Sequence, residues 1–355
     1  MPRLRDLNLT IGTFPTGPHN AITDVPDVLV GHTTLIYDEP RVARTGVTVI
    51  VPRRGEIWRD TAPAGIHSFN GCGELTGAHW IEESGMLSSP VAITCTHSIG
   101  VAQTALGKYS QTHGHTHMFA LPVAAETYDG HLNDADAHHL TEEHVFQAIA
   151  TATDGPVAEG NVGGGTGMIC HQFKGGIGTS SRIAQNQSGR WTVGALVQAN
   201  YGRRHLLRVD GVPVGRELGP DVVPLPSKPT GDGSIIIIIA TDAPLIPSQC
   251  KRLAQRATVG LARVGGVGHN FSGDIFLAFS TGNHVPDYGT GLIDLKMMPH
   301  EHMDALFEAT AEAVEEAILN ALCAAETMTG HQGFTAHALP VDKLGEVMKK
   351  YGRQI

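Results

Sequence analysis

Five consecutive isoleucines at residues 235–239 form the most hydrophobic run in the chain. Because apolar residues occupy successive positions without alternation, this run predicts a strand that is buried on both faces. Pro244 marks its end, since proline cannot donate to a β-ladder. Just before the run, Gly233 can adopt backbone conformations closed to other residues, and Ser234 stands where a loop enters the strand. A hydroxyl on a rigid element suits chemistry, although an ordinary turn before a core strand has the same pattern.

Shorter patterns predict the other elements. Apolar runs bounded by turn residues predict strands at residues 28–34, 47–51, 91–95, 191–200 and 275–279. Helical spacing and capping residues predict helices at residues 74–84, 98–107, 141–152, 247–264 and 302–328. Residues 210–230 carry five prolines and read as a long loop that leads to Ser234. With 41% apolar residues and 43 glycines, the chain suits a globular α/β protein with many tight turns.

Charge and cysteine content exclude some classes of protein. The 25 basic and 35 acidic residues give a formal net charge of −10, which favours neither nucleic acid nor an anionic membrane surface. The first residues lack the apolar core of a signal peptide, and no apolar run approaches the ~18 residues of a membrane span. The cysteines show no metal-ligand spacing, and we therefore expect reduced thiols in a cytoplasmic protein. The five are Cys72, Cys95, Cys170, Cys250 and Cys323.

Two motifs resemble ligand sites. His113, His115 and His117 alternate, so on a strand they would share one face, as metal ligands can. No carboxylate or cysteine stands at a matching spacing, which favours a polar loop or strand edge. The glycine-rich residues 159–168 resemble a phosphate-binding loop but lack its Gly-Lys-Ser/Thr ending, which favours close backbone packing or a pocket wall. We therefore expect neither a metal nor a cofactor.

Seven short segments follow one another along nearly the whole chain. They are AITDVPDVLVGH (21–32), NGCGELTG (70–77), ETYDG (126–130), NVGGGTGM (161–168), VQANYG (197–202), GDGSIIIIIATDAP (231–244) and SGDIFLAFST (272–281). In this order and spacing they resemble the self-processing aminopeptidases of the L-aminopeptidase/D-esterase and β-peptidyl aminopeptidase group. Each segment alone is a weak signal, whereas the ordered set is specific. Asp27 and Cys95 depart from the family pattern, which has Gly and Asn there, so finer pocket preferences can differ.

The resemblance implies a fold and a processing event. The fold is a four-layer α/β/β/α sandwich like that of N-terminal-nucleophile hydrolases, with different strand connectivity, in one catalytic domain over residues 1–355. The precursor is expected to cleave itself between Gly233 and Ser234. The fragments, residues 1–233 and 234–355, would stay together and assemble into homo-oligomers. The implied activity releases N-terminal residues from short peptides, amides or esters through an acyl-enzyme on Ser234.

The residues themselves suggest how Ser234 could be activated. After cleavage, its α-amine has a reference pKa near ~8 and can take the hydroxyl proton, directly or through a water. Ser272 and Asp274 lie two positions apart, so on one strand both would face Ser234. Asp274 would orient Ser272 and favour the ammonium form of the amine.

Three further residues are predicted to contact the substrate. Asn200 ends a predicted strand, and its amide N–H could stabilise the oxyanion. Glu126 is expected to pair with the free amine of the substrate, which would explain release of N-terminal residues. Tyr128 could hydrogen-bond near the scissile carbonyl, although a half-buried core tyrosine is the competing interpretation.

Other functions remain open at this point. Acyl transfer to an amine, as in the structurally related ornithine acetyltransferases, would use a threonine nucleophile, so Ser234 argues against it. A metal-dependent hydrolase would use the three alternating histidines. A non-catalytic homologue would remain one uncut chain. The sequence does not distinguish L-, D- and β-amino acid substrates.

Overall fold

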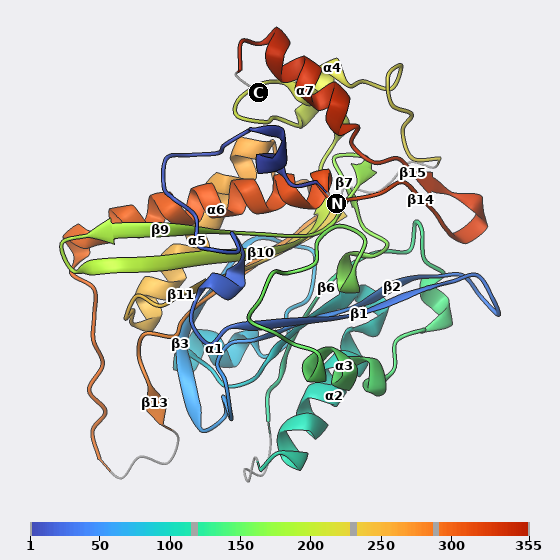
Figure 1. Cartoon of the computed structure of the whole chain (residues 1–355). Helices are drawn as coiled ribbons and strands as arrows, with labels where there is room; N and C mark the ends of the chain where they lie inside the picture. The colour runs from blue at the N-terminus through green and yellow to red at the C-terminus, as the bar shows by residue number, and fades with distance from the viewer. Residues whose placement is uncertain (1, 115–119, 228–232, 287–290, 354–355) are drawn as a thin grey trace.

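The computed structural model describes residues 2–114, 120–227, 233–286 and 291–353. Two β-sheets pack face to face, and helices cover the outer face of each (Figure 1). Separate apolar clusters fill the space between the sheets and the space between each sheet and its helices. The four-layer α/β/β/α arrangement expected from the sequence is therefore confirmed.

The smaller sheet has four strands in the order β1-β2-β5-β6. Their bounds are Leu29–Tyr37 (β1), Ala43–Val51 (β2), Val91–Cys95 (β5) and Val123–Thr127 (β6). Strands β5 and β6 are parallel, and the other pairs are antiparallel. Two helices cover its outer face, α2 (Ile99–Thr112) and α3 (Glu142–Ala150).

The larger sheet has seven strands in the order β13-β3-β12-β11-β10-β9, with β4 paired to β3. Their bounds are Asp60–Gly71 (β3), Met86–Leu87 (β4), Gly176–Asn186 (β9), Gly189–Tyr201 (β10), Gly233–Thr241 (β11), Gly273–Ser280 (β12) and Val285–Pro286 (β13). Strand β11 runs parallel to β12 and antiparallel to β10. The outer face carries α5 (Pro247–Val264) and α6 (Asp304–Cys323).

Shorter elements connect these layers. They are the helices α1 (Ala78–Ser84), α4 (Val214–Glu217) and α7 (Val341–Lys350), and two hairpins, β7 (Ile169–Cys170) with β8 (Phe173–Lys174) and β14 (Met328–Thr329) with β15 (Thr335–Ala336). Single 3₁₀ turns lie at Leu4–Leu7, Ile22–Asp24, Thr96–Ser98, Ala135–Ala137, Gly163–Gly165, Arg204–Leu206, His300–His302 and His331–Gly333.

The isoleucine run forms the core of β11. Ile235, Ile237 and Ile239 belong to the apolar layer beneath α5 and α6, whereas Ile236 and Ile238 face the smaller sheet. All five side chains are fully buried, as the unalternating pattern predicted. Since each such burial contributes about 1.5–3 kcal/mol, the strand gives Ser234 a rigid support.

The hydrophobic pattern did not predict strands β3 and β9, because glycine occupies positions on them that face a helix. A Cβ atom on Gly65 in β3 would lie 2.3 Å from the backbone nitrogen of Lys251 in α5. A Cβ atom on Gly178 in β9 would lie 2.0 Å from the carbonyl oxygen of Ala317 in α6. The glycines that let each helix approach its sheet also weaken the local strand signal.

Several predicted boundaries were wrong. The helix expected over residues 74–84 starts at Ala78, because the preceding residues turn toward the smaller sheet and Leu75 forms a bridge with Ala125. The helix expected over residues 302–328 ends at Cys323. The connector at residues 210–230 includes the one-turn helix α4.

A buried ion network joins β9 to α6. The Arg182 side chain is fully buried, with its Nε 3.0 Å from Oε2 of Glu312 and its Nη2 2.6 Å from Oε2 of Glu316. Glu316 also accepts from Arg5 at 2.7 Å, so the N-terminal segment is attached to the same network. Removing one member would leave buried charges without partners.

We therefore predict that Arg182→Ala lowers the free energy of unfolding by about 3–5 kcal/mol. The matched control is Arg353→Ala, which removes a half-exposed pair with Asp210 at 2.8 Å and should cost less than about 1 kcal/mol. Urea unfolding followed by circular dichroism measures both. Equal losses in the two variants would show that the buried network adds nothing beyond a surface pair.

Candidate active site

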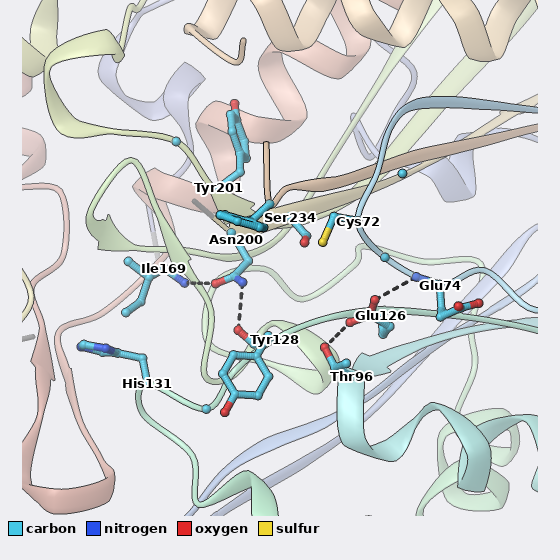
Figure 2. Close-up of a pocket in the computed structure, with 16 residues that line it drawn as sticks. Cys72, Glu74, Thr96, Glu126, Tyr128, His131, Ile169, Asn200, Tyr201 and Ser234 are labelled. Carbon is cyan, nitrogen blue, oxygen red and sulfur yellow. Dashed lines mark hydrogen bonds between the residues drawn. The ribbon is translucent and has the colours of Figure 1, made fainter. Parts of the chain in front are cut away.

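A cavity of about 600 Å³ lies where the ends of the two sheets meet (Figure 2). Sixteen residues line it: Gly71, Cys72, Gly73, Glu74, Thr96, Glu126, Tyr128, Gly130, His131, Ile169, Asn200, Tyr201, Gly202, Gly233, Ser234 and Phe271. They come from the ends of β3, β6, β10 and β11 with the segments that follow β3, β6 and β10, and from β7, the turn at Thr96–Ser98 and the segment before β12. The cavity thus brings together Glu126, Tyr128, Asn200, Gly233 and Ser234, which the sequence singled out.

Ser234 is the second residue of β11, directly opposite Asn200 on β10. Its hydroxyl is held by the backbone N–H of Gly273, which donates to Oγ at 2.9 Å. The preceding Gly233 has φ of +69°, and a Cβ atom there would lie 1.9 Å from the carbonyl oxygen of Asn200. Only glycine fits this position without strain, so the backbone before Ser234 is sterically defined.

Ser272 and Asp274 lie beside the start of β11. Ser272 precedes β12, and its hydroxyl donates to Oδ1 of Asp274 at 2.5 Å. Asp274 is the register partner of Ile235, which follows Ser234. Neither Ser272 nor Asp274 is among the described residues that line the cavity. Burial raises the pKa of Asp274 to about 6, against the opposing effect of the Ser272 hydrogen bond.

The Asn200 amide is fixed by two hydrogen bonds (Figure 2). Its Oδ1 accepts from the N–H of Ile169 at 2.8 Å, and its Nδ2 donates to the carbonyl oxygen of Tyr128 at 2.9 Å. The Tyr128 phenol is 51% exposed and points away from Ser234. Tyr128 therefore contacts Asn200 through its backbone carbonyl oxygen, while its phenol lies away from Ser234.

Glu126 places a buried carboxylate in the cavity wall. Its side chain is on β6 and the residue is 4% exposed. Oε1 accepts from the N–H of Glu74 at 2.9 Å, and the Thr96 hydroxyl donates to Oε2. Burial nevertheless raises its pKa. In the part of the chain that the structure describes, no Lys or Arg pairs with Glu126, so an incoming ammonium group would meet an unpaired carboxylate.

Sequence reasoning gave no role to Gly273 or Cys72. The N–H of Gly273 donates to the Ser234 hydroxyl, and Cys72 extends its thiol toward Ser234 (Figure 2). A backbone donor has no side-chain signal, so Gly273 could not be found from residue types. Cys72 lies within a segment that matched the family pattern, but a single cysteine between two glycines does not reveal what it faces.

The predicted histidine motif is only partly described. His113 lies at the end of α2, where its ring stacks on Tyr109 at 4.0 Å. His115 and His117 lie outside the described residues. Within the described ranges, no group of three or more His, Cys, Asp or Glu side chains is arranged to hold a metal ion. Nor does any helix there combine the length and apolar character needed to cross a bilayer.

Known proteins share this fold over the whole chain. The model of peptidase family S58 matches residues 20–336. The β-peptidyl aminopeptidase BapA of Sphingosinicella microcystinivorans is 46% identical over 371 residues, which cover 99% of this chain and 93% of the relative. The chain therefore belongs to peptidase family S58.

Solved structures agree with this assignment. A Burkholderia sp. β-aminopeptidase matches with a TM-score of 0.94 and 50% identity, covering 100% of both chains. The L-aminopeptidase D-Ala-esterase/amidase of Ochrobactrum anthropi matches with a TM-score of 0.92 and 44% identity over 100% of both chains. It is described as a prototype for the serine aminopeptidases and a new variant of the Ntn hydrolase fold. The predicted family, fold class and serine aminopeptidase function are thus confirmed.

Proposed function

We propose that the protein is a self-processed serine aminopeptidase whose nucleophile, Ser234, is activated by its own α-amine. The single observation that carries this proposal is the position of Ser234: it is the second residue of a buried strand, directly after a glycine in a left-handed conformation, and it lines the cavity. Cleavage before Ser234 would place a new amino terminus inside the pocket.

Cleavage itself would begin with an N-to-O acyl shift. Ser234 Oγ attacks the carbonyl carbon of Gly233, the bond from that carbon to the Ser234 nitrogen breaks, and the nitrogen gains the hydroxyl proton. Water then hydrolyses the resulting ester, which restores the hydroxyl and leaves a carboxylate on Gly233. Gly233 has a positive φ that glycine adopts without strain, so the backbone before Ser234 can take a conformation closed to other residues as Oγ approaches the carbonyl carbon.

The two fragments would remain associated after cleavage. Strand β11 of the second fragment lies between β12 of the same fragment and β10 of the first. Helix α6 of the second fragment packs on β9 of the first, where Arg182 pairs with Glu312 and Glu316. Separating the fragments would expose to water the face of β11 that packs on the smaller sheet and would break its ladder with β10. We propose that these cleaved units form homo-oligomers in the cytoplasm, where the five unpaired cysteines would stay reduced.

In each turnover, the amine of Ser234 would accept the hydroxyl proton while Oγ attacks the substrate carbonyl. The proton then passes to the departing amine or alcohol, and water releases the acyl group in the same way. A charged Asp274 would favour the transient ammonium. Asn200, opposite Ser234 and already fixed by Ile169, would donate to the oxyanion.

Glu126 would select substrates with a free amine. Its carboxylate is buried and accepts from the Glu74 N–H and the Thr96 hydroxyl, and no Lys or Arg among the described residues pairs with it. Burial raises its pKa most, and the nearby His97 lowers it only as the smallest influence, so the substrate ammonium would supply the main positive charge. A blocked amine would leave the carboxylate unpaired. We therefore propose short peptides, amides and esters with a free N-terminal amine as substrates.

We predict that Glu126→Gln lowers kcat/KM for an aminoacyl p-nitroanilide by an amount equivalent to about 2–5 kcal/mol. Glu74→Gln is the matched control, because that carboxylate lines the same cavity but is exposed. For the wild type, N-acetylated substrates should be equally poor. Since burial raises the pKa of Glu126, lowering the pH protonates it earlier than an exposed carboxylate, and KM should rise. Equal turnover of free and acetylated amines would assign Glu126 to structure alone.

A second prediction separates processing from turnover. Asp274→Asn keeps the shape of the side chain but removes the charge that would stabilise the ammonium of Ser234. Cleavage happens once and tolerates slowing, whereas turnover should fall by roughly 10²–10⁴. The sample is incubated until a denaturing gel shows full cleavage and is then assayed. A fully cleaved variant with a near wild-type rate would contradict the role proposed for Asp274.

A further inference from the structure

Cys72 occupies the cavity wall on the side where Ser234 and Glu126 approach each other. It lines the cavity together with both residues, and its thiol points toward the Ser234 hydroxyl (Figure 2). The next residue, Gly73, lies against the carboxylate, since a Cβ atom there would be 3.2 Å from Oε1 of Glu126. The segment 72–73 therefore reaches from the nucleophile to the buried carboxylate.

The backbone of this segment is fixed by its neighbours. The N–H of Cys72 donates to the carbonyl oxygen of Ser272 at 3.2 Å. A Cβ atom on Gly273 would lie 2.6 Å from the carbonyl oxygen of Cys72, and one on Gly73 would lie 3.0 Å from Cα of Gly273. A side chain on Gly273 would clash with this backbone, and one on Gly73 would be tightly placed against it. The Cys72 side chain is consequently the part of this wall that can vary without moving the backbone behind Ser234.

We infer that Cys72 determines which aminoacyl groups the enzyme accepts. The inference rests on the proposed function, in which the substrate carbonyl lies at Ser234 and its amine at Glu126. The atoms that join these two groups, and the side chain that they carry, must then pass beside Cys72. Its thiol sets the width of the cavity there, so residue 72 controls the size of the aminoacyl side chain.

The five cysteines allow this wall to be altered in the folded enzyme. Cys72 is exposed, whereas Cys95, Cys170, Cys250 and Cys323 are buried. Methyl methanethiosulfonate should therefore react first at Cys72: the thiolate attacks the reagent's sulfur, methanesulfinate leaves, and a methylthio group remains in disulfide linkage. The added group enlarges the side chain without any mutation, and dithiothreitol removes it.

The test compares Cys72→Ala, Cys72→Leu and methylthiolated wild type on p-nitroanilides of glycine, alanine, leucine and phenylalanine. We expect Cys72→Leu and the methylthiolated enzyme to lose kcat/KM for leucine and phenylalanine by about 10–200-fold relative to glycine. Cys72→Ala should shift the ratio the opposite way and resist the reagent. Dithiothreitol should restore the original ratio in the labelled wild type.

Two results would overturn the inference in distinguishable ways. If wild type hydrolyses these substrates and the ratios stay unchanged after mass spectrometry confirms labelling at Cys72, residue 72 does not determine specificity. If wild type that is cleaved before Ser234 hydrolyses no L-, D- or β-aminoacyl p-nitroanilide, the proposed function fails and the inference fails with it. A uniform loss on every substrate, which also leaves the ratios unchanged, would overturn the inference in the first of these ways.

Discussion

The active site depends on one strand that is buried on both faces. Strand β11 fills the centre of the larger sheet, with its isoleucines alternating between two apolar layers, so it cannot slide or tilt without opening both. Ser234 is the second residue of this strand, so its backbone is held in place by the same packing. Asn200 on one neighbouring strand and Gly273 on the other are positioned by the same ladder. A flexible loop could not hold a nucleophile and its hydrogen-bond partners in so constant a geometry.

Two carboxylates next to this strand are held in surroundings that disfavour their charge. Burial raises the pKa of Asp274 to about 6 and also raises the pKa of Glu126. Among the described residues, no Lys or Arg pairs with either carboxylate, so each is suited to a cationic partner from elsewhere. In the proposed mechanism these partners are ammonium groups: the amino terminus created by cleavage for Asp274, and the substrate amine for Glu126. Selectivity for substrates with a free amine would thus follow because the Glu126 carboxylate lacks a Lys or Arg partner among the described residues.

The sequence predicted the elements that depend on local hydrophobic pattern. The isoleucine strand, the strand at residues 91–95 and the helix at residues 247–264 form where they were expected. Strands β3 and β9 were missed because Gly65 and Gly178 serve packing against helices that lie far away in the sequence. Asp27 has φ of +70°, a backbone conformation that favours glycine. The glycine of the family pattern at this position is therefore explained by the backbone. The Gly273 N–H could not be predicted as a donor to Ser234, because every residue except proline has a backbone N–H.

The central claim is that cleavage before Ser234 creates the catalytic amino terminus. It is tested most directly by mass spectrometry of the purified protein under denaturing conditions, together with its Ser234→Ala variant. We predict two fragments that correspond to residues 1–233 and 234–355, the second beginning at Ser234, and a single full-length chain for the variant. An active wild type that remains one uncut chain, or cleavage that persists in Ser234→Ala, would contradict it.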